Sequence, residues 1–165
     1  MAIAISSAGI KVSYAFELTA GVRPTTGFTW IKGIKELPEL NPAPDTLETT
    51  TFDNLEYKSY INGLKDLGGS LSFTANFTQE LFDKWNGDGG VMEAYATNSA
   101  DNKALWIAID IPGISEACFF TAQPSAIGVP GTGVNQVLET PLYITPTGEP
   151  TWAEKPTYTT ESVGE

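Results

Sequence analysis

The chain contains few types of residue that could take part in catalysis or metal binding. There is one cysteine, Cys118 in the run "SEACFFTA", and there is no histidine. Without histidine a cysteine–histidine nucleophile pair is impossible. A single cysteine also allows neither a disulfide within the chain nor a Cys/His metal site. Beside two phenylalanines, Cys118 is expected to be a small buried hydrophobic residue.

The twenty acidic residues could supply the carboxylate pair that a glycosidase needs. Nothing in their spacing singles out such a pair, however. No phosphate-binding loop, nucleophile elbow or zinc signature is present in the sequence. The stretch "NGDGG" at 86–90 lacks the spaced carboxylates and the closing glutamate of a calcium loop. We therefore expect no catalytic site, no cofactor and no metal, and we expect that the protein is not an enzyme.

Tryptophans leave one binding hypothesis open, because flat indole rings can stack on sugars. The four tryptophans are Trp30, Trp85, Trp106 and Trp152. Trp85 falls on the apolar stripe of a predicted helix and is expected in the core, whereas Trp106 falls on the outward side of its strand. The alternative function is accordingly a carbohydrate-binding β-sandwich module, which a specific ligand in a soluble glycan screen would favour.

Composition and charge limit the remaining functions. The chain has 165 residues, of which 41% are hydrophobic and 18% charged, and its net charge is −11. This length favours one domain, at most with a tail. The negative charge repels phosphate and argues against DNA binding by attraction. The start "MAIAISSAGI" has no basic n-region, and no run of 18 apolar residues occurs, so we expect no membrane contact and synthesis in the cytoplasm.

Alternating apolar and polar residues predict a mainly β fold. The clearest pattern is "SLSFTANF" at 70–77, whose odd-numbered residues are apolar and whose even-numbered residues are polar and uncharged. Thr78 is a good N-cap for a helix over "QELFDKWN", which the glycines of 86–90 interrupt. The other predicted strands are residues 10–16, 26–34, 46–52, 105–111, 115–123 and 134–145. This count favours a β-sandwich or barrel with one flanking α-helix.

The stretch "TLETTTFDN" at 46–54 is predicted to be a strand by the β-propensity of threonine, yet neither of its faces is apolar. Such a strand usually lies at a sheet edge. It follows a long segment, 35–46, in which Pro38, Pro42 and Pro44 restrict the backbone. Long loops in compact domains are usually functional or disordered. We expect a neighbouring protomer to pair with residues 46–52.

Several longer stretches together resemble a known family. They are "GIKELPELNPAPDTLETTTFDN", "YKSYINGLKDLGGSLSFTANFT", "ELFDKW" and "LYITPTGEPTW". In order and spacing, from about Gly9 to Trp152, they resemble the major tail tube proteins of long non-contractile-tailed bacteriophages, the siphophage type, particularly those of Gram-positive hosts. The resemblance implies a tail tube domain over 1–152, and the prolines and acidic residues of the remaining stretch predict a flexible C-terminal tail over 153–165.

The same resemblance implies a function. Such proteins form hexameric rings in which the sheets of all subunits join as one large closed β-barrel, and the rings stack into the tail tube of the virion. The implied partners are further copies of the chain, the tape-measure protein, and the tail-tip and tail-terminator proteins. DNA passes through the tube without specific binding, which the negative charge suits.

Two groups of site residues follow from the pattern and the resemblance. Residues expected at subunit and ring-stacking contacts come from the proline-rich segment and the threonine stretch: Leu37, Pro38, Leu40, Pro42, Pro44, Thr49, Thr50, Thr51 and Phe52. Residues expected to line the channel come from the polar faces of two strands: Ser72, Thr74, Asn76 and Asp110.

Overall fold

The computed structural model describes residues 4–159. The chain divides into two compact units: unit 1 is Met1–Pro38 with Ser70–Glu165, and unit 2 is Glu39–Gly69. The strands of unit 1 are β1 (Lys11–Phe16), β2 (Thr29–Ile31), β3 (Ile34–Glu36), β6 (Leu71–Asn76), β7 (Leu105–Asp110), β8 (Glu116–Pro124), β9 (Glu139–Pro146) and β10 (Thr151–Glu154). Its helices are α1 (Gln79–Trp85) and α2 (Val91–Ala100), and unit 2 contains β4 (Thr46–Glu48) and β5 (Tyr60–Asn62).

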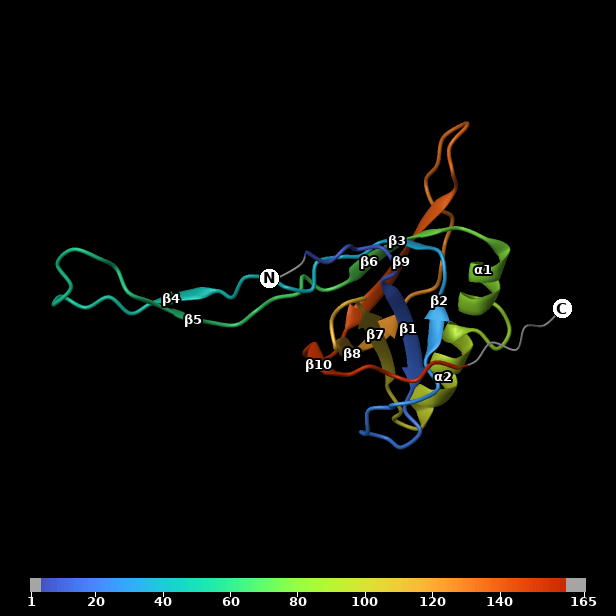
Figure 1. The fold of residues 1–165 in the computed structure, drawn as a ribbon, viewed down its shortest axis with the longest axis horizontal. Helices are drawn as coiled ribbons and strands as arrows, with labels where there is room; N and C mark the ends of the chain where they lie inside the picture. Colours follow the sequence, from blue (N-terminus) through green and yellow to red (C-terminus); the bar gives the residue numbers. More distant parts are fainter. Residues whose placement is uncertain (1–3, 160–165) are drawn as a thin grey trace. The chain divides into compact units, whose positions relative to one another are not determined.

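Within the described residues, the eight strands of unit 1 form one sheet, in which the paired strands are antiparallel. The order is β2-β1-β7-β8-β9-β6-β3, and β10 pairs with β8. One edge of β8 carries β7, whereas its other edge carries β10 over its first half and β9 over its last residues. Figure 1 shows this sheet curled, with α1 and α2 together beside β2.

The two end strands of the sheet are joined by only Lys32 and Gly33. In a flat sheet, strands six positions apart would be separated by about 29 Å, at ~4.8 Å per strand. The link from Ile31 to Ile34 can reach only about 10 Å. The sheet must therefore curl until its ends approach, as in a barrel. Gly33 has a φ of +86°, in the left-handed region that favours glycine, and its carbonyl accepts a hydrogen bond from the Asn76 N–H at 2.9 Å.

The main core lies on one face of the sheet. The pairing registers bring alternate residues of the central strands onto this face, as the sequence predicted for 10–16, 70–77 and 105–111. Its buried side chains include Val12, Leu71, Phe73, Leu105, Ile107, Ile109, Phe120, Leu142 and Ile144. The prediction of a mainly β fold is thus confirmed, and its cause is the period-two alternation of these strands.

The two helices add a second layer. Thr78 caps α1, because its side chain accepts from the Leu81 N–H at 3.2 Å. Trp85 is buried, as expected, and its indole N–H donates to the Ser125 carbonyl at 2.7 Å. The sequence predicted one interrupted helix, whereas the chain has two. The glycine-containing stretch 86–90 separates them, and α2 begins after Gly90.

The opposite face of the sheet is also partly buried, which the sequence did not predict. It carries a second cluster of buried residues, Ala15, Ala108, Ala117 and Phe119 from β1, β7 and β8, together with Phe28 just before β2. Ala153 and Tyr158 of the C-terminal segment pack against this cluster. The segment is fixed by backbone hydrogen bonds from Phe28 N–H to Thr157 and from Thr159 N–H to Phe28, of 3.2 and 2.8 Å.

This packing changes the predicted domain boundary. The sequence placed a flexible tail at 153–165, but β10 continues to Glu154, and Tyr158 forms a parallel bridge with Phe28. Residues 153–159 are therefore part of unit 1. The tail was predicted from its prolines and acidic residues. That composition does not reveal that Ala153 and Tyr158 pack against the sheet. Residues 160–165 of the predicted tail lie outside the described residues.

Unit 2 is an insertion between two paired strands. Strand β3 precedes it and β6 follows it, and Glu36 of β3 pairs with Thr74 of β6. Inside unit 2, β4 pairs with β5 of the same chain, with Leu47 opposite Ile61. The expected strand over 46–52 is only Thr46–Glu48. We expected a neighbouring protomer to pair with this strand. That expectation is wrong for the edge of β4 that is hydrogen-bonded to β5.

Candidate functional site

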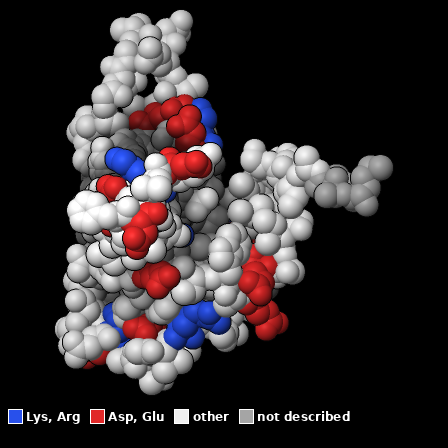
Figure 2. All heavy atoms as spheres, turned by 90° about the vertical axis from the view of Figure 1, so that its left-hand side faces the viewer, with Lys and Arg blue, Asp and Glu red and all other residues white. Residues whose placement is uncertain are grey.

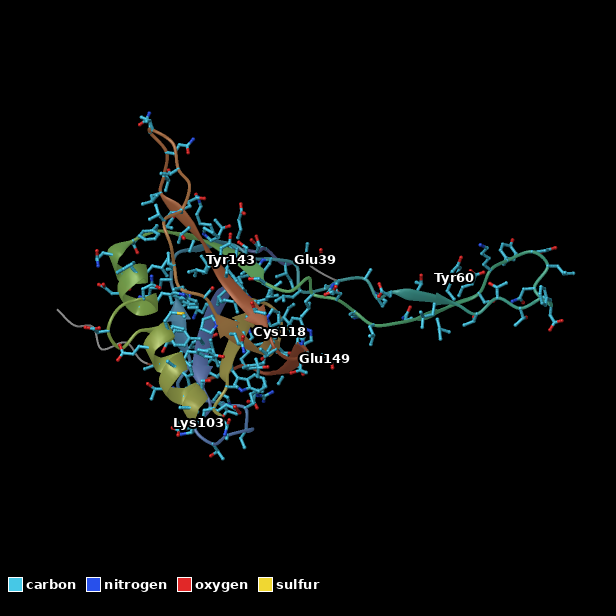
Figure 3. All side chains as sticks on the ribbon, turned by 180° about the vertical axis from the view of Figure 1, so that it is seen from behind. Glu39, Tyr60, Lys103, Cys118, Tyr143 and Glu149 are labelled. Carbon is cyan, nitrogen blue, oxygen red and sulfur yellow. The ribbon has the colours of Figure 1, made fainter. Side chains whose placement is uncertain are left out.

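Unit 2 has no core of its own. None of its residues, 39–69, is buried. Seven large apolar or aromatic side chains are exposed on it instead: Leu47, Phe52, Leu55, Tyr57, Tyr60, Ile61 and Leu64. Figure 3 shows side chains along unit 2, with Tyr60 labelled, directed away from the two paired chain segments. Large exposed apolar patches are a common feature of interaction surfaces, so unit 2 is the candidate site.

Part of the threonine stretch is hydrogen-bonded within the unit. The Thr49 N–H donates to the Ser59 carbonyl at 2.8 Å, and the Thr50 hydroxyl accepts from the Ser59 N–H at 2.9 Å. Asn54 N–H donates to the Thr51 carbonyl at 3.1 Å, which closes a turn with Phe52 and Asp53 at its corner. Strand β4 is thus paired with β5 on one edge, and most side chains of unit 2 are exposed.

The predicted contact residues divide between the units. Leu37 and Pro38 belong to unit 1, and the others belong to unit 2. Leu37, Pro38, Leu40, Pro42, Pro44 and Thr50 are half-buried, whereas Thr49, Thr51 and Phe52 are exposed. Of these residues, only the exposed ones are fully presented to a partner. The prediction concentrated on threonines and prolines and missed the apolar residues 55–64.

Three of the predicted channel residues share one surface. Ser72, Thr74 and Asn76 lie on the face of β6 opposite to Leu71 and Phe73. The register with β9 places Tyr143 opposite Ser72, and Glu139 opposite Asn76. Glu139 also forms an ion pair with Lys35 of β3. The result is a polar face formed by β6 and β9, on which Tyr143 is labelled in Figure 3.

Asp110, the fourth channel candidate, lies elsewhere. Its carboxylate forms an ion pair with Lys155 at 2.8 Å and accepts the Tyr158 hydroxyl at 3.0 Å. The side chain is only 14% exposed. The carboxylate fastens the C-terminal segment to β7, so we leave Asp110 out of the channel surface. Strand alternation could indicate only that it faces away from the core, and the segment that covers it was not predicted.

Alkaline pH should weaken this attachment. Burial, followed by the hydrogen bond and the negative charge of Asp110, raises the pKa of Tyr158 from 10.0 to about 12. Because the folded pKa lies above the unfolded one, the neutral phenol stabilises the folded state. That stabilisation is complete below pH 10.0 and is lost as the pH rises towards about 12.

Tyr158→Phe should therefore destabilise the protein by about 1 kcal/mol near neutral pH, through loss of the hydrogen bond. The difference from wild type should shrink above pH 10.0. Urea unfolding at several pH values measures it. Tyr57→Phe is the matched control, because Tyr57 lies exposed in unit 2. A constant difference across this pH range would contradict the assignment.

A second apolar surface lies on the connection between β8 and β9. Val129, Val134, Val137 and Leu138 of this loop are exposed. Residues 125–138 contain no charged side chain. In Figure 1 the loop extends beyond β9 at the top of the view, and in Figure 2 this protrusion is white, whereas acidic and basic side chains are interspersed below it. The sequence showed only a Gly/Pro-rich break here.

One cavity lies where the chain crosses from β2 to β3. It measures about 150 Å³ and lies between the crossover and the two helices. Apolar side chains supply part of its wall, namely Ile31, Leu81, Trp85 and Val91. Polar groups supply the rest, from Tyr14, Lys32, Asn76, Thr78, Glu80 and Lys84. The Asn76 Oδ1 atom is buried without a hydrogen-bond partner.

The structure does not support Trp106, the main residue of the carbohydrate-binding hypothesis, as a sugar-stacking residue. Trp106 is half-buried against the cluster of Ala15, Phe28 and Phe119, and its indole nitrogen is buried. Trp30 lies under the ammonium groups of Lys11 and Lys32, at 5.3 and 5.6 Å from its ring centroid. Trp106 therefore offers no open stacking platform, whereas Trp30 and Trp152 remain 40% and 51% exposed.

Metal-binding groups and membrane-spanning helices are absent from the described residues. Among residues 4–159, no group of three or more cysteine, aspartate or glutamate side chains is arranged to hold a metal ion. Neither described helix has the length and apolar character needed to cross a membrane. Cys118 is buried on β8, labelled in Figure 3, and burial raises the pKa of its thiol.

Comparison with known proteins identifies the fold. No protein-family model matches the chain, and no curated protein matches its sequence. Among solved structures, a chain in the cryo-electron-microscopy structure of the anti-feeding prophage (AFP) baseplate, symmetrised six-fold, is similar to it. The TM-score is 0.59 at 13% identity, and the match covers 93% of this chain and 98% of the other. The chain therefore shares the fold of a prophage baseplate component over almost its whole length.

Proposed function

We propose that the protein is a structural component of a phage-type tail that assembles as stacked rings into the tail tube. The observation that carries the proposal is the fold shared with a chain of a prophage baseplate, which extends over 93% of this chain. A likeness that includes most of both chains makes a shared structural role a reasonable inference, although fold alone does not define function. The six-fold symmetry of that baseplate is compatible with hexameric rings.

Unit 2 supports an assembly role. It exposes seven large apolar or aromatic side chains and buries none of its residues. Burial of such side chains against a partner is favourable by about 25 cal/mol per Å² of apolar area. In the proposed tube, unit 2 contacts adjacent subunits within a ring or between rings. The apolar loop 125–138 provides a second contact.

The polar face of β6 and β9 is the proposed channel lining. Ser72, Thr74 and Asn76 carry no charge, and the whole chain has a net charge of −11. A surface without a basic cluster gives DNA few phosphate contacts, so counterion release contributes little to binding. DNA would slide along such a wall without specific binding. The tape-measure, tail-tip and tail-terminator proteins remain the proposed partners of the tube.

Electron microscopy of the purified protein tests the proposal. At high concentration, or after addition of its native tail-tip assembly, the protein should form rings and long tubes with a central channel. Single rings that never stack would favour a baseplate component over a tube. A protein that stays monomeric even with its native initiator would overturn both forms of the proposal.

A further inference from the structure

We propose that the cavity at the β2–β3 crossover receives the side chain of Phe52 from unit 2 of a second copy of the chain. This inference rests on the proposed function and names a contact that would hold neighbouring subunits together. The cavity belongs wholly to unit 1, and its lining residues come from β1, the crossover, the end of β6, and both helices. Phe52 is fully exposed in unit 2.

Size supports this pairing. The cavity measures about 150 Å³. An engineered apolar cavity of about 150 Å³ in another protein binds benzene, so a phenyl ring fits a space of this size. Ile31, Leu81, Trp85 and Val91 provide an apolar wall for the ring. An aromatic side chain seated in a desolvated pocket is also the usual form of a strong interface contact.

Shape of the turn supports the choice of Phe52 among the exposed residues of unit 2. The 3.1 Å hydrogen bond between Asn54 N–H and the Thr51 carbonyl closes a turn whose two central residues are Phe52 and Asp53. A ring at the corner of a turn projects away from both chain segments. It can therefore enter a concave site without displacing the β4–β5 ladder, whose residues end at Glu48 and begin again at Tyr60.

Charge complementarity points to the same pair. Unit 2 has six acidic and two basic residues, a net charge of −4, and Asp53 is adjacent to Phe52. The cavity wall includes Lys32 and Lys84, and Lys11 lies 5.3 Å from the ring of Trp30, another lining residue. Glu80 is the acidic residue of the wall and forms an ion pair with Lys84 at 3.3 Å. In a chain with only nine basic residues, this group attracts an acidic turn.

Cross-linking between two different chains tests the contact. One chain carries Thr51→Cys, which leaves Phe52 and Asp53 in place, and the other carries Glu80→Cys at the cavity. After assembly of the mixture, a short thiol-reactive cross-linker should give a two-chain product on a denaturing gel. Leu64→Cys replaces Thr51→Cys in the matched control, because Leu64 is also exposed in unit 2. Wild type controls for the buried Cys118.

Phe52→Ala provides the second measurement. It should raise the protein concentration needed for assembly by about tenfold or more, as loss of a central aromatic contact does. Leu64→Ala should change it far less. Two results would overturn this contact while the wild type still forms tubes: no cross-linked product from the Thr51→Cys and Glu80→Cys chains, or as much product from Leu64→Cys. The proposed function would then still stand. Failure of the wild type to assemble with its native initiator would overturn both.

Discussion

A chain in which residues 39–69 are replaced by a short Gly/Ser linker is expected to fold normally and to form no tubes. All buried side chains found among the described residues lie outside this segment. The linker has a short distance to bridge, because β3 and β6 on either side of the insertion are paired with each other. The replacement therefore converts a long insertion into an ordinary hairpin connection.

Stability of this variant should stay within about 1 kcal/mol of wild type, because loop-closure entropy changes only slowly with loop length. Denaturant unfolding measures the stability, and electron microscopy measures the yield of tubes. A second variant, with the same linker in place of the loop residues 129–134, keeps unit 2 and removes part of the other proposed contact, so its tube yield measures the contribution of that loop separately. Loss of cooperative unfolding in the first variant would mean that unit 2 supports the fold of unit 1. Normal tubes would mean that assembly does not need unit 2.

Most strands of unit 1 could be predicted from the sequence. Residues 71–76 alternate strictly between apolar and polar, and residues 105–110 place Leu105, Ile107 and Ile109 on one face, so the core-facing side of both strands could be assigned. The N-cap at Thr78 and the burial of Trp85 followed from local chemistry in the same way. Alternation reports only whether a side chain faces the core of its own sheet. It could not show that the opposite face of the sheet, with Ala108 and Phe119, is also buried, under the C-terminal segment.

In unit 2 the local sequence pattern did not predict the observed structure. Thr46–Phe52 has high β-propensity throughout, yet only Thr46–Glu48 is a strand. The partner strand β5 is three residues long, and the chain turns at Thr51–Asn54. Propensity measures how well a residue suits a strand, but a strand also needs a paired neighbour of sufficient length. The exposed apolar residues around Leu55 and Tyr60 are the feature of the sequence on which the proposed interface rests.

The sequence favoured a β-sandwich or barrel, but the strand order that curls the sheet could not be predicted from local patterns. Lys32 and Gly33 looked like part of a weak strand, and they are the link between the two ends of the sheet. The cavity is lined by this link together with residues of both helices. No local feature of the sequence places Leu81 of α1 beside Ile31 of β2. The pairing order of all the strands is needed to bring them together.

A chain that ends at Trp152 is expected to be less stable than one that ends at Thr159 by about 2 to 5 kcal/mol. The shorter chain loses the cover that Ala153 and Tyr158 give to the buried rings of Phe28 and Phe119. Full burial of one such ring contributes about 1.5–3 kcal/mol. The truncation also removes the ion pair of Lys155 and the hydrogen bond of the Tyr158 hydroxyl at Asp110.

Denaturant unfolding of the two chains measures this difference. The chain ending at Thr159 keeps every contact of the C-terminal segment described above, so it is the matched reference. A full-length chain with Lys155→Gln and Tyr158→Phe separates the polar contacts from the packing, and it should lose only part of the difference. Equal stability of the chains ending at Trp152 and Thr159 would mean that residues 153–159 are dispensable for the fold. The predicted domain boundary after Trp152 would then be correct.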